Sequence, residues 1–93
     1  MPPYINRINP DTGDPGDRFS VIILGDVFSH VTSCDFGADV SVVSYEIVND
    51  GAIQAKIQIS EDAKSGYRDV VLTDPSGNGW KSNGFQVRVV NIE

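Results

Sequence analysis

The stretch from Ala52 to Ser60 constrains the fold more than any other part of the chain. Its apolar residues occupy every second position and alternate with polar ones, namely Ile53, Ala55, Ile57 and Ile59 against Gln54, Lys56 and Gln58. A period of two places the apolar side chains on one face of a β-strand and the polar side chains on the other. This stretch therefore predicts a strand in a sheet with one buried face and one face in water.

The same period recurs elsewhere in the chain. It predicts strands at Phe85–Val89 and Arg68–Thr73, and it predicts a strand that is apolar on both faces, hence covered on both sides, at Phe19–Leu24. Three weaker patterns predict the strands Tyr4–Ile8, with Ile5 and Ile8 on opposite faces, Val31–Phe36 and Val40–Val48. The last of these changes phase, so we expect a bend or a change of sheet near Ser44.

Turn-forming residues separate the predicted strands. They gather at residues 9–17, 49–51 and 74–79, and the Asn49-Asp50-Gly51 sequence is a strong hairpin signal. Only Ser60–Gly66 suits a helical turn, and it suits no more than one. Several short strands spaced by turns are typical of an all-β sandwich or a small barrel.

Length and charge restrict the functional classes. A chain of 93 residues is long enough for one domain with one core. Seven Lys and Arg against thirteen Asp and Glu give a net charge of −6, which disfavours non-specific binding to nucleic acid and to anionic membrane surfaces. The longest apolar run, Val21 to Leu24, is far too short for a transmembrane helix, so we expect no membrane insertion.

Short motifs follow the predicted strands in a definite order. They are Pro10-x-x-Gly13, Gly25-x-x-Phe28, Phe36-Gly37 and Gly66-x-x-Asp69-Val70. In this order, and over about Pro3 to Val89, the chain resembles the IPT/TIG domain. The resemblance implies an immunoglobulin-like β-sandwich of about seven antiparallel strands with Greek-key connections. It also implies that residues 1–93 are a single domain excised from a longer protein.

The resemblance implies a function as well. It predicts a non-enzymatic structural or interaction module of a larger exported or cell-surface bacterial protein. Its partners would be the neighbouring domains of the parent chain and a protein or glycan ligand. One alternative is a carbohydrate-binding accessory domain of a polysaccharide-active enzyme, and another is a DNA-associated dimerisation domain, which the charge disfavours. We expect an extracellular or periplasmic location, although the segment shows no signal peptide and a cytoplasmic location stays open.

Few residues in the sequence are candidates for catalysis or metal binding. His30 is the single histidine and no Gly-x-Ser-x-Gly motif occurs, so we expect a surface histidine, no catalytic activity and no cofactor. The weak metal candidates are Asp11, Asp14 and Asp17, whose carboxylates would suit Ca²⁺, although aspartates also favour turns through their own hydrogen bonds. The single cysteine, Cys34, is expected to be a buried apolar residue.

Three aromatic residues are the candidates for contact with a ligand or partner: Trp80, Tyr67 and Tyr45. Trp80 is predicted to lie in the loop before the last strand. We favour a position in which its ring covers the edge of the core. The alternative is an exposed ring that stacks on a sugar or anchors a protein.

Overall fold

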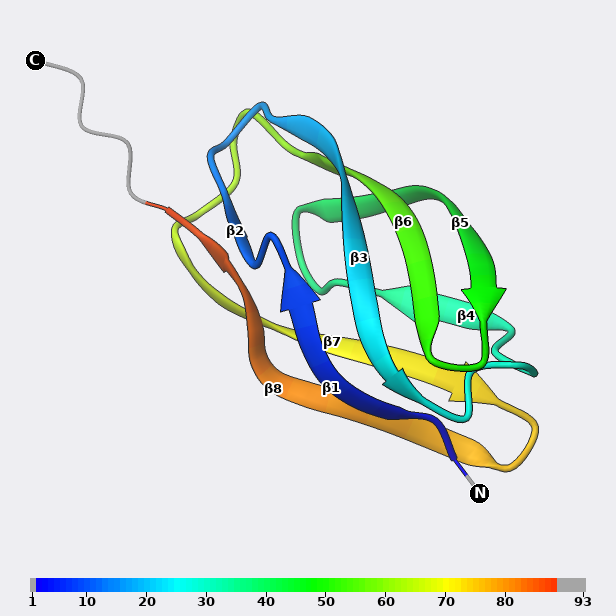
Figure 1. Ribbon diagram of the computed structural model, residues 1–93. Coiled ribbons are helices and arrows are strands. Elements are labelled where there is room, and N and C mark those ends of the chain that lie inside the picture. Colours follow the sequence, from blue (N-terminus) through cyan, green and yellow to red (C-terminus); the bar gives the residue numbers. More distant parts are fainter. Residues whose placement is uncertain (1, 89–93) are drawn as a thin grey trace, which may run out of the picture.

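Two four-stranded sheets pack face to face in the computed structural model, which describes residues 2–88 (Figure 1). Sheet A has the order β1-β3-β6-β5, and its strands are β1 (Tyr4–Asn9), β3 (Arg18–Asp26), β6 (Ala52–Ile59) and β5 (Val40–Asn49). Sheet B has the order β2-β8-β7-β4, and its strands are β2 (Thr12–Gly13), β8 (Gly77–Val87), β7 (Gly66–Asp74) and β4 (Ser33–Asp35). None of the described residues forms a helix that could cross a membrane.

This strand order is that of a constant-type immunoglobulin domain, with β2 as an additional short strand beside β8. The prediction of an all-β immunoglobulin-like sandwich is therefore confirmed. The described residues form eight strands rather than about seven, and β2 runs parallel to β8 whereas the other pairs are antiparallel. A strand of two residues cannot show an alternation, so β2 was hidden in the predicted turn cluster.

The core lies between the sheets, and β6 supplies one row of it. Ile53, Ala55 and Ile57 are 0% exposed and Ile59 is 1% exposed, whereas the side chains between them, Gln54, Lys56 and Gln58, face solvent. From sheet B, Val70, Leu72, Phe85 and Val87 complete the same cluster. The ring of Phe85 packs edge-on against that of Phe36, with their centroids 5.6 Å apart. The alternation read from the sequence thus gives the correct face for every residue of β6.

For two strands, β1 and β3, the sequence predicted the wrong side chains to be buried. Ile5 and Ile8 are both buried, because the pairing of β1 with β3 shifts register between Ile5 and Arg7 and turns both side chains inward. β3 is central in sheet A, yet Leu24 is 37% exposed and Ile22 is half-buried. The sandwich has only two layers, so nothing covers the outer face of this strand.

The irregularity predicted near Ser44 is present, but the change of sheet is not. The pairing of β5 with β6 shifts between Val42 and Ser44 and again between Ile47 and Asn49, and the whole of β5 stays in sheet A. β5 is an edge strand, and bulges on an edge discourage pairing with another chain. The exposed side chains of Val43 and Val48 lie at these two shifts.

Two boundaries also differ from expectation. The last strand begins at Gly77 rather than Phe85, so residues 77–79 belong to β8 and not to a turn. Val89, the predicted end of that strand, lies outside the described residues. The segment Ser60–Gly66 is not helical, and it contains a single turn in which the Ala63 N–H donates to the Ser60 carbonyl at 3.0 Å.

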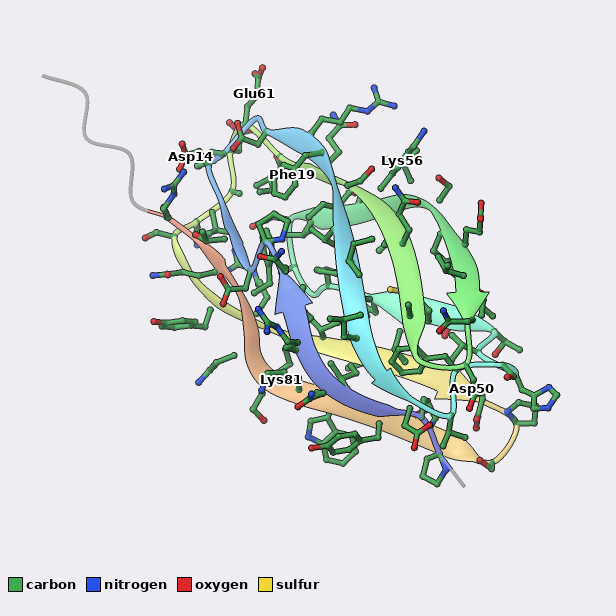
Figure 2. The ribbon with its side chains drawn as sticks, viewed as in Figure 1. Asp14, Phe19, Asp50, Lys56, Glu61 and Lys81 are labelled. Carbon is green, nitrogen blue, oxygen red and sulfur yellow. The ribbon has the colours of Figure 1, made fainter. Side chains whose placement is uncertain are left out.

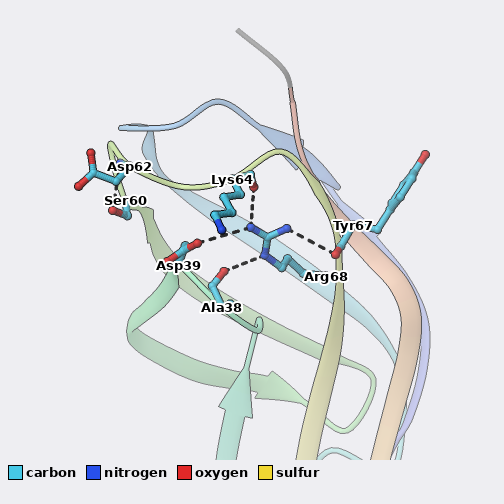
Figure 3. A network of polar contacts seen from close by, with 7 residues as sticks. All are labelled: Ala38, Asp39, Ser60, Asp62, Lys64, Tyr67 and Arg68. Carbon is cyan, nitrogen blue, oxygen red and sulfur yellow. Dashed lines mark hydrogen bonds and ion pairs between the residues drawn. The ribbon is translucent and has the colours of Figure 1, made fainter.

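Arg68 connects the loops at one end of the sandwich (Figure 3). Its guanidinium donates from Nε to the carbonyl of Ala38 at 2.7 Å and from Nη2 to the carbonyl of Lys64 at 2.6 Å. Asp39 Oδ2 lies 3.8 Å from Nη2, and the Arg68 side chain is only 11% exposed. One cation thus satisfies carbonyls of the β4–β5 loop and the β6–β7 loop.

The alternation makes a quantitative prediction for stability. Ile57→Ala removes buried methyl groups from a packed core and should lower the free energy of unfolding by about 2–5 kcal/mol. Gln58→Ala, its neighbour on the solvent face, should change it by no more than about 0.5 kcal/mol. Urea unfolding of both variants measures the difference, and equal effects would contradict the register.

The Arg68 network makes a second prediction. Arg68→Ala removes a largely buried side chain and its two charge-assisted hydrogen bonds to loop carbonyls, and should cost about 2–3 kcal/mol of unfolding free energy. Arg88→Ala is the matched control, because its ion pair with Asp14 is exposed at 2.8 Å and should be worth no more than about 1 kcal/mol. Thermal and urea unfolding of the two variants should rank them in this order, and a reversed order would be evidence against the network.

Candidate functional site

Trp80 is the most exposed aromatic ring on sheet B. It lies on β8, opposite Val71 of β7, and not in a loop. Directly opposite residues of an antiparallel pair share a face, and Val70 and Leu72 point into the core, so Val71 and Trp80 point outward. The indole is 63% exposed. The expectation that it covers the core edge was therefore wrong.

Gly79 explains why Trp80 faces outward. It takes the inward position opposite Leu72, and a β-carbon there would lie 1.7 Å from the Pro3 carbonyl oxygen. The backbone before β1 thus occupies the space that an inward side chain would need. Residue 80 comes next on the strand, so its side chain must leave on the solvent side.

Polar side chains surround Trp80 on the outer surface of sheet B. Thr73 and Asn78 form the neighbouring cross-strand pair, and the Thr73 hydroxyl donates to Asn78 Oδ1 at 3.0 Å. Asp35 and Ser33 of β4 lie opposite Val71 and Thr73. We call this surface the Trp80 face and define it by Ser33, Asp35, Val71, Thr73, Asn78 and Trp80. Its members come from three strands, so only the register of the sheet brings them together, and no sequence motif marks the set.

The two tyrosine candidates lie elsewhere. Tyr67 is 60% exposed on β7, opposite Gln86, and Figure 3 shows its ring pointing away from Arg68. It is four residues from Val71, so about 13 Å of strand separates it from the row that holds Trp80. Tyr45 is half-buried on β5 in the other sheet, and its hydroxyl donates to the Val31 carbonyl at 3.4 Å. The structure thus does not gather the three aromatic residues into one site.

The acidic loop has partners within the protein. Asp14 Oδ1 accepts a hydrogen bond from Arg88 Nε at 2.8 Å, and Asp17 Oδ2 accepts one from the Asp14 N–H at 2.9 Å. The Asp11 carbonyl accepts the Gln86 N–H at 2.8 Å. Within residues 2–88, no three His, Cys, Asp or Glu side chains are grouped so that they could hold a metal ion. The contacts of these aspartates are those of turn residues.

Two side chains that could act as nucleophiles, Cys34 and Ser76, are held in unreactive arrangements. Cys34 is half-buried, and burial together with the nearby charge of Asp35 raises the pKa of its thiol to about 12, which keeps it protonated at neutral pH. The Ser76 hydroxyl donates to Asp74 Oδ1 at 2.7 Å. A hydrolytic relay requires the serine to donate to a histidine instead.

The comparison with known families agrees with the architecture. The chain matches the sequence profile of the IPT/TIG domain over residues 3–89, which is nearly its whole length. It has no significant match among curated proteins. Domains of the IPT/TIG type are generally non-enzymatic interaction modules with an immunoglobulin-like fold. The match over nearly all residues and the two-sheet sandwich agree, and the chain belongs to the IPT/TIG domain family.

Proposed function

We propose that this domain is an interaction module of a larger exported or cell-surface bacterial protein and that it contacts its partner through the Trp80 face. The observation that carries the proposal is the 63% exposure of Trp80 on the outer surface of sheet B. Tryptophan is enriched among the residues that dominate binding energy at protein interfaces. A partner that covers the indole removes apolar area from water and gains about 25 cal/mol for each Å².

The residues around Trp80 suit the rim of an interface. Asn78, Thr73 and Ser33 are neutral hydrogen-bonding side chains, and Asp35 adds one negative charge. An apolar centre with a polar rim is the usual anatomy of a protein interface. By contrast, the outer face of β6 in sheet A presents Gln54, Lys56 and Gln58. The Trp80 face is therefore a better candidate than the outer face of β6.

The charge supports a protein partner rather than DNA. A net charge of −6 repels the phosphate backbone, whose neutralisation dominates affinity for nucleic acid. A neutral or basic protein surface would meet no such repulsion.

Site-specific photocrosslinking tests this proposal. A photoreactive aromatic amino acid replaces Trp80 in the parent protein, and a second variant carries it at Lys56 on the outer face of β6. We expect a discrete crosslinked product from position 80 that is absent from position 56. Trp80→Ala should change the free energy of unfolding by no more than about 0.5 kcal/mol, because the ring is exposed. The same products from both positions, or none from position 80, would contradict the proposal.

Binding of a carbohydrate is the second candidate function, and the Thr73–Asn78 pair beside Trp80 favours it. An exposed indole offers an apolar face to a sugar ring, and the paired side chains of Thr73 and Asn78 lie next to it to bond hydroxyl groups. Electrophoresis in native gels that contain starch or xylan tests this function. The domain should be retarded and Trp80→Ala should not. Equal mobility of both proteins with and without polysaccharide would count against binding of these two polysaccharides.

A further inference from the structure

At the end of the sandwich opposite the Arg68 network, backbone hydrogen bonds join three connections between strands. These are the β3–β4 loop, the β5–β6 turn and the β7–β8 turn. The Phe28 N–H donates to the Asp50 carbonyl at 2.9 Å, and the Thr32 N–H donates to the Thr73 carbonyl at 2.7 Å. Figure 2 shows Asp50 at this end and Asp14 and Glu61 at the other. In immunoglobulin-type sandwiches, loops that cluster at one end can form a binding surface, as they do in antibodies.

A small cavity of about 200 Å³ lies between two of these connections. Val27 and His30 line it from the β3–β4 loop, and Asp74, Pro75 and Ser76 line it from the β7–β8 turn. Val27 and Pro75 provide apolar walls. Pockets for drug-sized ligands usually measure about 300–1,000 Å³, so this cavity is the size for one side chain rather than for a larger cofactor.

The backbone of Val27 gives the cavity a fixed wall. Its φ is +64°, in the left-handed region that a β-branched residue rarely adopts. The Val27 N–H donates to Asp26 Oδ1 at 2.9 Å, and the next N–H is bound to Asp50. Such a conformation persists only where the surroundings hold it in place.

A nearly buried carboxylate lies in the same cavity. Asp74 is 7% exposed, and its Oδ1 accepts hydrogen bonds from the Ser76 N–H at 2.8 Å, the Ser76 hydroxyl at 2.7 Å and the Gly77 N–H at 3.1 Å. The bonds from Ser76 lower the pKa of Asp74, so the group is ionised at neutral pH. All three of these bonds fall on Oδ1, which leaves Oδ2 available to a ligand.

The surroundings add negative charge. Asp26 and Asp50 lie at the same end, and each carboxylate accepts a backbone N–H of the β3–β4 loop. Residues 26–32, 49–51 and 74–77 include no lysine or arginine. A cation that enters the cavity would therefore meet the Asp74 carboxylate, with Asp26 and Asp50 elsewhere at the same end and no lysine or arginine side chain from these loops.

We propose that this cavity receives the lysine or arginine side chain of a polypeptide partner. The alkyl part of that side chain would lie between Val27 and Pro75, and its ammonium or guanidinium group would bind Asp74 Oδ2. Long cationic side chains commonly combine an apolar stem with a charged end in this way. The cavity is separate from the Trp80 face, so the proposal does not depend on the function proposed above.

NMR titration with a defined probe tests this proposal. The ¹⁵N-labelled domain is titrated with acetyl-Gly-Lys-Gly-amide and with its uncharged analogue, which has norleucine in place of lysine. Saturable shifts are expected for the amides of Val27–His30 and Asp74–Gly77 with the lysine peptide alone. Absence of such shifts at peptide concentrations up to about 10 mM, or equal shifts with the norleucine peptide, would overturn the proposal.

Two conservative variants separate binding from folding. Asp74→Asn keeps the Oδ1 acceptor for Ser76 and Gly77 but removes the charge, so affinity should fall by about tenfold or more. Asp50→Asn makes the same chemical change outside the cavity and should retain most of the affinity. Trp80→Ala should bind the peptide as the unmodified domain does. If Asp74→Asn is folded, as judged by its spectrum and its urea unfolding, and still binds as tightly, the proposal is wrong.

Discussion

The meeting of two apolar sheet faces in a single layer is the constraint on which the rest of the structure depends. β6 presents its isoleucines from sheet A, and β7 and β8 present Val70, Leu72, Phe85 and Val87 from sheet B. With only two layers, each strand has one face in the core and one face toward water. Because each strand has a core face and a water face, Gln58 is exposed, Leu24 is partly exposed and Trp80 lies on the surface.

Side chains of opposite charge hold the loops together at the two ends of the sandwich. At one end, the cation of Arg68 gathers carbonyl groups from two loops. At the other end, the carboxylates of Asp26, Asp50 and Asp74 gather backbone N–H groups. Charge-assisted hydrogen bonds are stronger than neutral ones, so few side chains are needed to fix each set of loops. As a result, the second end carries negative charge.

The β7–β8 hairpin carries both proposed contact surfaces. Asp74 is the last residue of β7 and pairs with Gly77, whereas Trp80 pairs with Val71 on the same two strands. Three residues of strand, or about 10 Å, separate these two pairs. Because this spacing is odd, Trp80 points to the outer surface whereas Asp74 points to the same side as Val70 and Leu72, so the two surfaces lie on different sides of the hairpin.

The sequence by itself determined the fold class, the family and the strands β6 and β7, because alternation and turn residues are local signals. Only the tertiary structure decided the rest. The bulge that turns Ile5 and Ile8 to the same face depends on the pairing with β3, and the two residues of β2 form a strand only because β8 lies beside them. The exposure of Trp80 depends on the Pro3 backbone beside Gly79, which is distant in sequence. The cavity at Asp74 exists because loops more than forty residues apart are held together, as the bond between Thr32 and Thr73 shows. Register and long-range contact are properties of paired strands, and a pattern within one strand does not contain them.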